Sequence, residues 1–151
     1  SGSINFTGGP VTMEAVVRVP ALGTGATYRV GFGSANVGTT APTKKAYFEF
    51  VGAATGQWVH QSTGTGSASA NVGNTFAANA WMKLTITVDS AASTITYQKD
   101  SDTAVVVSTA ANIPVATDIL CPFAANVGTA ASSRNLDIDY IKITKVFSTA
   151  R

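Results

Sequence analysis

Apolar and polar residues alternate along much of this chain, which is the pattern of a strand with one buried face. The clearest case is the segment 81–89, where Met82, Leu84, Ile86 and Val88 share one face and mostly polar residues share the other. Segments 12–19 and 45–52 have the same period of two. The same reasoning predicts further strands at 28–33, 56–61, 70–76, 93–99, 103–108, 119–125 and 136–145.

Turn signals separate these strands at intervals of roughly 8–12 residues, which is typical of a β-sandwich or a β-barrel. Segment 62–69 reads as a hairpin loop, and strands 81–89, 93–99 and 103–108 read as a meander of tight hairpins. Segment 136–145 is apolar on both faces after Ile138, which predicts a strand in the middle of the sandwich. The expected core comprises Val17, Phe48, Phe50, Leu84, Ile86, Val88, Ile95, Ile138 and Tyr140.

Composition supports the strand assignment. The chain contains 16 Val, 8 Ile and 21 Thr but only 4 Leu, and β-branched residues fit a pleated surface better than a helix. Its 24 Ala gather with Gly, Ser, Thr and Asn in turn-like company instead of forming helical stripes. We therefore predict an all-β fold, an antiparallel β-sandwich of jelly-roll type.

The size of the chain predicts one domain, because domains usually contain about 100–200 residues. We expect a leading segment or cloning remnant at 1–10, one jelly-roll domain at 11–147 and a C-terminal tail at 148–151. The net charge is only +2, which argues against a nucleic-acid partner bound through many phosphates. No uncharged apolar stretch is long enough for a transmembrane helix, so we expect no membrane insertion.

A short motif, Ala-Asn-Val-Gly, occurs at 35–38, 70–73 and 125–128. Its unequal spacing argues against a solenoid repeat. Loops of similar local geometry are the favoured explanation, because Asn and Gly tolerate positive φ angles. The alternative is that loops 33–44 and 126–134 meet at one rim and form a polar binding edge.

A resemblance to a known family rests on a series of structural motifs. They are Tyr-Arg-Val-Gly-Phe-Gly at 28–33, Ala-Tyr-Phe-Glu-Phe at 46–50, Gln-Trp at 57–58, Trp-Met-Lys-Leu-Thr-Ile at 81–86, Asn-Ile-Pro at 112–114 and Leu-Asp-Ile-Asp-Tyr at 136–140. In this order they resemble the concanavalin A-like (laminin G-like) jelly-roll domains of bacteriophage tail fibres, tailspikes and related virion proteins. The resemblance covers about residues 11–145 and departs from the family at 99–102, where the family's hairpin usually carries Asp-Gly.

Catalytic motifs are weak. A glycoside hydrolase needs two carboxylates facing one cleft, and the nearest pair, Asp137 and Asp139, has no third acid at Ile141 as jelly-roll glucanases have. His60 is the only histidine and no Gly-x-Ser-x-Gly elbow accompanies it. We therefore predict no catalytic residues, no enzyme activity and no cofactor. Asp100 and Asp102 are hard-oxygen ligands that could hold Ca²⁺, but an ordinary solvated turn is favoured over that alternative.

The positive case is sugar binding, since a sugar needs an aromatic face surrounded by polar groups. We expect one ligand-binding patch on neighbouring strands, although burial of Trp58 in the core is the alternative; its residues are Arg29, Tyr47, Glu49, Trp58 and His60. The predicted function is a non-catalytic domain of a phage virion protein that binds a bacterial surface glycan or host receptor. A structural capsid or tail decoration domain and, less favoured, a glycan-degrading jelly-roll enzyme are the alternatives. The resemblance also implies location in the virion and assembly as a homotrimer, with a monomeric isolated domain as the competing expectation.

Overall fold

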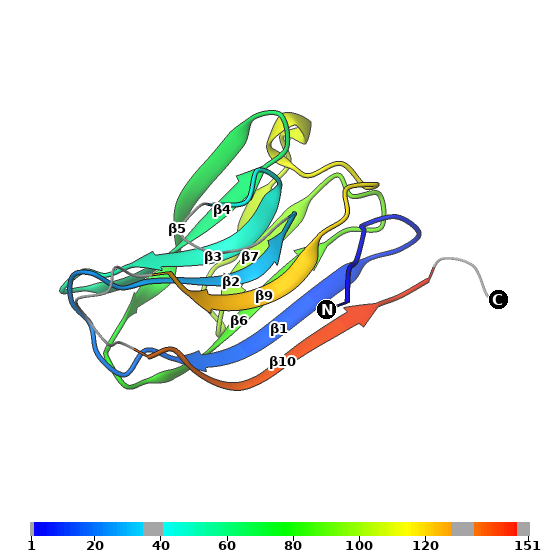
Figure 1. Cartoon of the computed structure of the whole chain (residues 1–151). Helices are drawn as coiled ribbons and strands as arrows, with labels where there is room; N and C mark the ends of the chain where they lie inside the picture. Colours follow the sequence, from blue (N-terminus) through cyan, green and yellow to red (C-terminus); the bar gives the residue numbers. More distant parts are fainter. Residues whose placement is uncertain (1, 35–40, 128–134, 148–151) are drawn as a thin grey trace.

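The chain folds as two five-stranded antiparallel sheets packed face to face, as the computed structural model in Figure 1 shows. Residues 2–34, 41–127 and 135–147 are described. One sheet has the strand order β10-β1-β6-β7-β8 and the other has the order β5-β4-β3-β2-β9. The prediction of an all-β antiparallel sandwich is confirmed.

The strand bounds follow the predicted alternation closely. They are β1 Val11–Arg18, β2 Thr27–Gly33, β3 Lys45–Val51, β4 Gly56–Thr63, β5 Ser67–Phe76, β6 Trp81–Val88, β7 Ile95–Lys99, β8 Val105–Val107, β9 Cys121–Asn126 and β10 Asp137–Lys145. The expected hairpin loop at 62–69 is shorter than predicted, because β4 and β5 extend into it and leave a turn around Gly64. A single 3-10 turn occupies Ala110–Asn112, and no helix of the described residues is long and apolar enough to cross a bilayer.

The core lies between the two sheets and is rich in aromatic side chains. Phe48 makes edge-to-face contacts with Trp58 of its own sheet and with Tyr97 of the opposite sheet. Phe6 is fully buried against Phe32, so the segment before β1 contributes to the core. Seven predicted core residues are buried: Val17, Phe48, Phe50, Leu84, Ile86, Val88 and Ile95.

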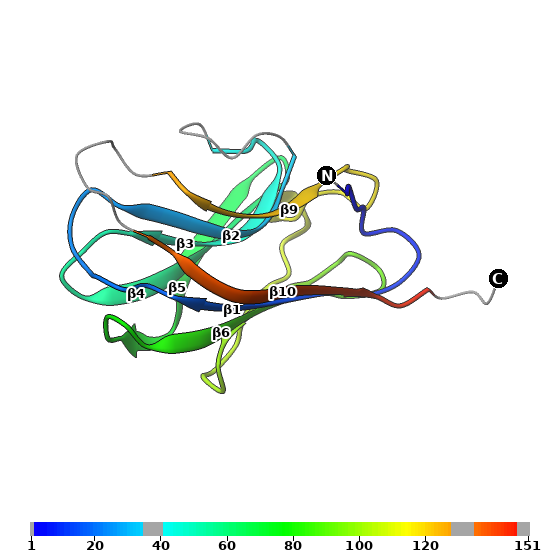
Figure 2. The same ribbon diagram turned by 60° about the horizontal axis from the view of Figure 1, so that its bottom comes forward.

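The predicted position of the last strand is wrong. β10 lies at an edge of its sheet, beside β1, so Ile138 and Tyr140 are exposed instead of buried. Apolar residues on both faces of a strand can mean burial on both sides, but β10 is an edge strand whose apolar side chains are exposed. The strands β9 and β10 are the edges of the two layers on the same side of the sandwich, as Figure 2 shows.

Candidate functional site

The outer face of the sheet β5-β4-β3-β2-β9 carries a cluster of polar side chains from three neighbouring strands. Register places Arg29 of β2 opposite Glu49 of β3, and Tyr47 of β3 opposite Gln61 of β4. Directly opposed residues of an antiparallel pair project to the same face of the sheet. These four residues therefore form one group, which we call the outer-face cluster.

Glu49 lies at the centre of the outer-face cluster. The Arg29 Nε donates to Glu49 Oε2 at 2.7 Å, and the Gln61 Nε2 donates to Glu49 Oε1 at 3.2 Å. The Arg29 and Glu49 side chains are only 10% and 14% exposed, so water screens this ion pair weakly. The carboxylate thus fixes a guanidinium and an amide beside each other.

Tyr47 lies next to this ion pair and is nearly covered. Its ring is approached by the Arg29 guanidinium, with Cζ 5.7 Å from the ring centroid, and by the Lys45 Nζ at 5.6 Å. Its edge packs against Phe123. Burial and the Glu49 charge raise the pKa of the Tyr47 hydroxyl to about 12, against an opposing effect from Arg29. The phenol is therefore a neutral proton donor at physiological pH.

A glycine makes this arrangement of Tyr47 feasible. Gly31 of β2 lies opposite Tyr47, and a Cβ at Gly31 would come within 2.5 Å of the Tyr47 Cα. Any larger residue at this position would push the two strands apart or shift Tyr47.

The rest of the outer face supplies hydrogen-bonding groups and few charges. Polar residues from β4 and β5 continue the face beyond Gln61, and they are half-buried or exposed: Gln57, Thr63, Ser67, Ser69 and Asn71. All eight acidic residues of the chain are described, and Glu49 is the only one carried by the strands of this sheet. A pair of carboxylates for glycoside hydrolysis is therefore not available on this sheet.

Of the predicted site residues, Arg29, Tyr47 and Glu49 are brought together, whereas Trp58 and His60 lie on the opposite face. His60 is directly opposite Phe48 and points into the core, where it stacks on Tyr97 with ring centroids 4.8 Å apart. Trp58 is fully buried and donates its indole N–H to the Met82 sulfur. The prediction that all five residues form one patch is therefore wrong. In this register the outward-facing residues of β4 beside the cluster are Val59 and Gln61.

Burial lowers the pKa of His60. The chain therefore holds a neutral imidazole inside the sandwich, away from the outer-face cluster. Sequence reasoning missed Gln61 as a cluster residue. The signal was present, because once Trp58 is assigned to the core the period of two places Gln57 and Gln61 on the outer face.

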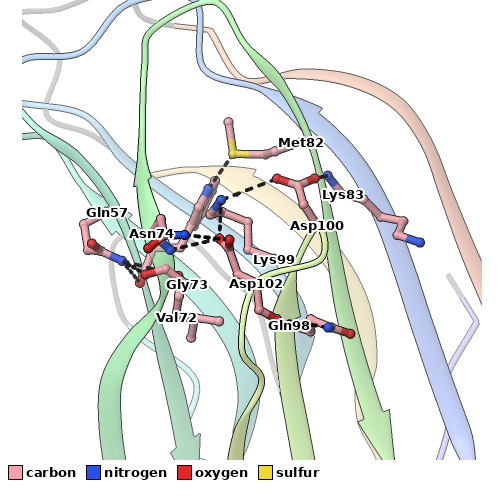
Figure 3. Close-up of polar contacts among 11 residues, drawn as sticks. Gln57, Val72, Gly73, Asn74, Met82, Lys83, Gln98, Lys99, Asp100 and Asp102 are labelled. Atoms are coloured by element: carbon pink, nitrogen blue, oxygen red, sulfur yellow. Dashed lines mark hydrogen bonds and ion pairs between the residues drawn. The ribbon is translucent and has the colours of Figure 1, made fainter.

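Asp100 and Asp102, which were considered as calcium ligands and assigned to a solvated turn, bind a lysine. Figure 3 shows Lys99 Nζ between the two carboxylates, 3.4 Å from Asp100 Oδ2 and 2.6 Å from Asp102 Oδ2. Asp102 also accepts hydrogen bonds from the backbone and side chain of Asn74 in β5. The oxygens that would hold a cation are thus committed to an ammonium group and to amides.

This arrangement, which we call the Lys99 clamp, joins the β7–β8 turn of one sheet to β5 of the other. A Cβ at Gly73 would overlap the Asp102 carboxylate, so the close approach requires glycine there. Burial works to lower the pKa of Lys99, but the hydrogen bond to Asp102 and the two carboxylate charges raise it overall. Among the described residues no group of three or more His, Cys, Asp or Glu side chains could hold a metal ion.

The remaining predicted features fall elsewhere. Asp137 forms a two-pronged interaction with Arg18, in which the Arg18 Nη2 lies 2.6 Å from Asp137 Oδ2. Asp137 lines a hollow between β9 and β10 that holds no second acid among its described residues, and Asp139 is exposed. The suggested binding rim of loops 33–44 and 126–134 includes 35–40 and 128–134, which lie outside the described residues.

Comparison with known proteins gives matches by fold but not by sequence. No protein-family profile matches the chain, and no curated protein sequence matches it. Among solved structures, the chain is similar to an alginate lyase from Alteromonas sp. 272, with 9% identity over 95% of this chain and 75% of that one, and a TM-score of 0.64. It is also similar to a marine PL7 alginate lyase from Zobellia galactanivorans, with 12% identity, coverage of 96% and 65%, and a TM-score of 0.60.

A third similar structure is a family 7 alginate lyase with one histidine and one tyrosine substituted, in complex with its substrate (GGMG). The identity is 12%, the coverage is 99% of this chain and 66% of that one, and the TM-score is 0.60. The present chain thus spans about two thirds to three quarters of the lyases it resembles. These likenesses establish a concanavalin A-like jelly-roll fold, and the substrate complex is consistent with glycan binding by this fold.

The comparisons correct two expectations from the sequence. A non-catalytic binding domain and the absence of enzyme activity were predicted, but the three similar structures named above are alginate lyases. The alternative ranked lower from the sequence, a glycan-degrading jelly-roll enzyme, is the better supported one. The paired-acid criterion applies to glycoside hydrolysis and does not test for elimination.

Proposed function

We propose that this chain is a polysaccharide lyase domain that cleaves a uronate-containing polysaccharide on the outer face of the sheet β5-β4-β3-β2-β9. The observation that carries the proposal is the outer-face cluster, in which Arg29, Gln61 and Tyr47 surround Glu49. The fold shared with alginate lyases supports it. Alginate is therefore the first substrate to test.

The chemistry of the cluster suits elimination better than hydrolysis. Hydrolysis by the usual route needs two carboxylates, and this sheet offers one. Elimination from a uronate instead requires donors that stabilise charge on the substrate carboxylate, a group that removes the adjacent proton and an acid for the departing oxygen. A single carboxylate beside a guanidinium, an amide and a phenol provides these functions.

Each residue of the cluster has a definite role in the proposal. Arg29 and Gln61 donate to the uronate carboxylate, and Glu49 holds both donors and accepts the proton next to that carboxylate. The neutral Tyr47 hydroxyl protonates the glycosidic oxygen as its bond to carbon breaks. Arg29 and Tyr47 are buried while Glu49 and Gln61 are half-buried, so the polymer first meets Glu49 and Gln61.

The test is incubation of the chain with alginate and with other uronate polymers, followed by ultraviolet absorbance of the unsaturated uronate product. We expect product with the wild-type chain and a loss of about 10²–10⁴-fold in rate for Tyr47→Phe, the range for removal of a general acid. Tyr97→Phe is the matched control, because this tyrosine lies in the core. Absence of unsaturated product from every uronate polymer, or full activity of Tyr47→Phe, contradicts the proposal.

Two expectations from the sequence are kept as proposals. A bacterial surface glycan is the candidate natural polymer, and the virion is the candidate location. Both rest on the resemblance to tail-fibre and tailspike domains and are independent of the assay on alginate.

A further inference from the structure

The sandwich has four edge strands, and three of them have features that discourage pairing with another chain. β8 is only three residues long, and β9 contains Pro122, which cannot donate to a neighbouring strand. β5 is largely polar and has a register shift in its pairing with β4, with Gly73 at a φ of 67°. β10, like β5, has a register shift, at Asp139, but it differs from the other edges in having nine residues with neither proline nor glycine.

β10 also exposes apolar side chains on both of its faces. Ile138, Tyr140, Ile141 and Ile143 have exposed fractions of 44%, 41%, 39% and 37%. Among the described residues, β10 pairs only with β1, so its other edge presents free backbone groups. An exposed, long and apolar edge strand is a template for the addition of another strand.

The charges on β10 favour a particular partner. Asp137 and Asp139 lie at the beginning of the strand, and Lys142 and Lys145 lie toward its end. An antiparallel copy of β10 brings the acidic half of each strand beside the basic half of the other, whereas a parallel copy brings like charges together. The exposed pair Asp139 and Lys142 is available for such contacts.

We propose that β10 pairs antiparallel with β10 of a second copy of this chain. The two sheets β10-β1-β6-β7-β8 then become continuous across a two-fold axis near the middle of β10. Such a contact uses the same surface on both copies, so it closes as a dimer and leaves no edge for a third subunit. The inferred assembly is therefore a dimer instead of the homotrimer expected from the resemblance.

The first experiment measures mass by light scattering across a range of protein concentrations up to millimolar. We expect the wild-type chain to approach twice the monomer mass and Ile141→Lys to raise the dissociation constant at least about tenfold, as loss of a central interface residue does. Val106→Lys is the matched control, because Val106 is an exposed apolar residue on β8, the other edge of the same sheet. Circular dichroism verifies that each variant is folded.

A charge exchange tests the antiparallel direction. Asp139→Lys alone should weaken the dimer several-fold, because it places basic residues in both halves of β10. Asp139→Lys combined with Lys142→Asp should restore the dimer, because the exchanged charges at 139 of one copy and 142 of the other are again opposite in sign. Three results would overturn the proposal: a wild-type chain that stays monomeric at millimolar concentration, a trimer, or equal weakening of the dimer by Val106→Lys and Ile141→Lys. A monomer that binds an unrelated β-strand peptide through this edge would also overturn it and would assign β10 to a different partner.

Discussion

Both faces of β3 and β4 carry aromatic side chains, but those of the inner face pack in the core and that of the outer face lies among polar and charged groups. The inner face carries Phe48, Phe50 and Trp58, which pack in the core with ring contacts on all sides. The outer face carries Tyr47, Glu49 and Gln61, linked by hydrogen bonds and charge. Both faces contain buried aromatic rings, so burial of an aromatic side chain does not distinguish structural from chemical roles here.

The difference between the faces lies in what surrounds each ring. Phe48 is contacted by the rings of Trp58 and Tyr97, whereas Tyr47 is contacted by two cations and one ring. Truncation on the inner face should therefore affect stability, and substitution on the outer face should affect function more than stability.

The largest expected effect is on the inner face. Phe50→Ala should lower the free energy of unfolding by about 3–5 kcal/mol, because it empties a site that Trp58 and Phe76 border. Chemical denaturation of the wild type and the variant measures this. Val51→Ala is the control, because the Val51 side chain is 62% exposed and its truncation should change stability by less than about 0.5 kcal/mol. Equal effects at the two positions would mean that the faces are assigned incorrectly.

A smaller effect is expected from Glu49→Ala on the outer face. The substitution leaves the buried Arg29 guanidinium without its carboxylate, and it should cost about 1–3 kcal/mol, the penalty for a buried polar group that loses its partner. Replacing Arg29 by Met together with Glu49→Ala should recover part of this loss, because no uncompensated charge then remains. If the single variant were as stable as the wild type, the ion pair would contribute nothing to the fold.

The smallest effect concerns pH and His60. Because burial lowers its pKa in the folded state, the unfolded chain takes up a proton first as pH falls below about 6.5. Above that pH, His60 therefore has no effect on the pH dependence of the free energy of unfolding. As pH falls toward the folded-state pKa, proton uptake by the unfolded chain lowers the free energy of unfolding by at most about 1.4 kcal/mol per pH unit.

His60→Phe should remove this slope while keeping a ring against Tyr97. Unfolding measured by denaturant at several pH values between neutral and mildly acidic compares the two chains. An identical pH dependence in both would show that His60 is not the group responsible.

The strands were predictable from the sequence because the period of two is a local property. β6 illustrates this, since Leu84 and Ile86 are buried where the alternation places them. The register between strands is not local, and it is the register that puts His60 opposite Phe48 instead of Glu49. The outer-face cluster was therefore predicted only in part, with Arg29, Tyr47 and Glu49 included and Gln61 missed.

The error at β10 has a different physical origin. Ile138 and Tyr140 were assigned to the core on hydrophobicity alone, although an edge strand can be equally apolar when its sheet is open on that side. An extra residue in β10 at the register shift beside Val16 and Val17 further disturbs the alternation. A hydrophobic pattern shows that burial of a segment would be favourable, but it does not distinguish burial in the core of the same chain from burial against another chain.

The Lys99 clamp has a consequence for how this domain depends on its surroundings. Many loops that bring carboxylates together rely on a dissolved ion, so their order changes with the composition of the medium. Here the ammonium group is attached to the polypeptide, and its local concentration is set by the side chain instead of by the solution. The junction between β5 and the β7–β8 turn should thus form without a bound metal ion, and a chelator should leave it unchanged.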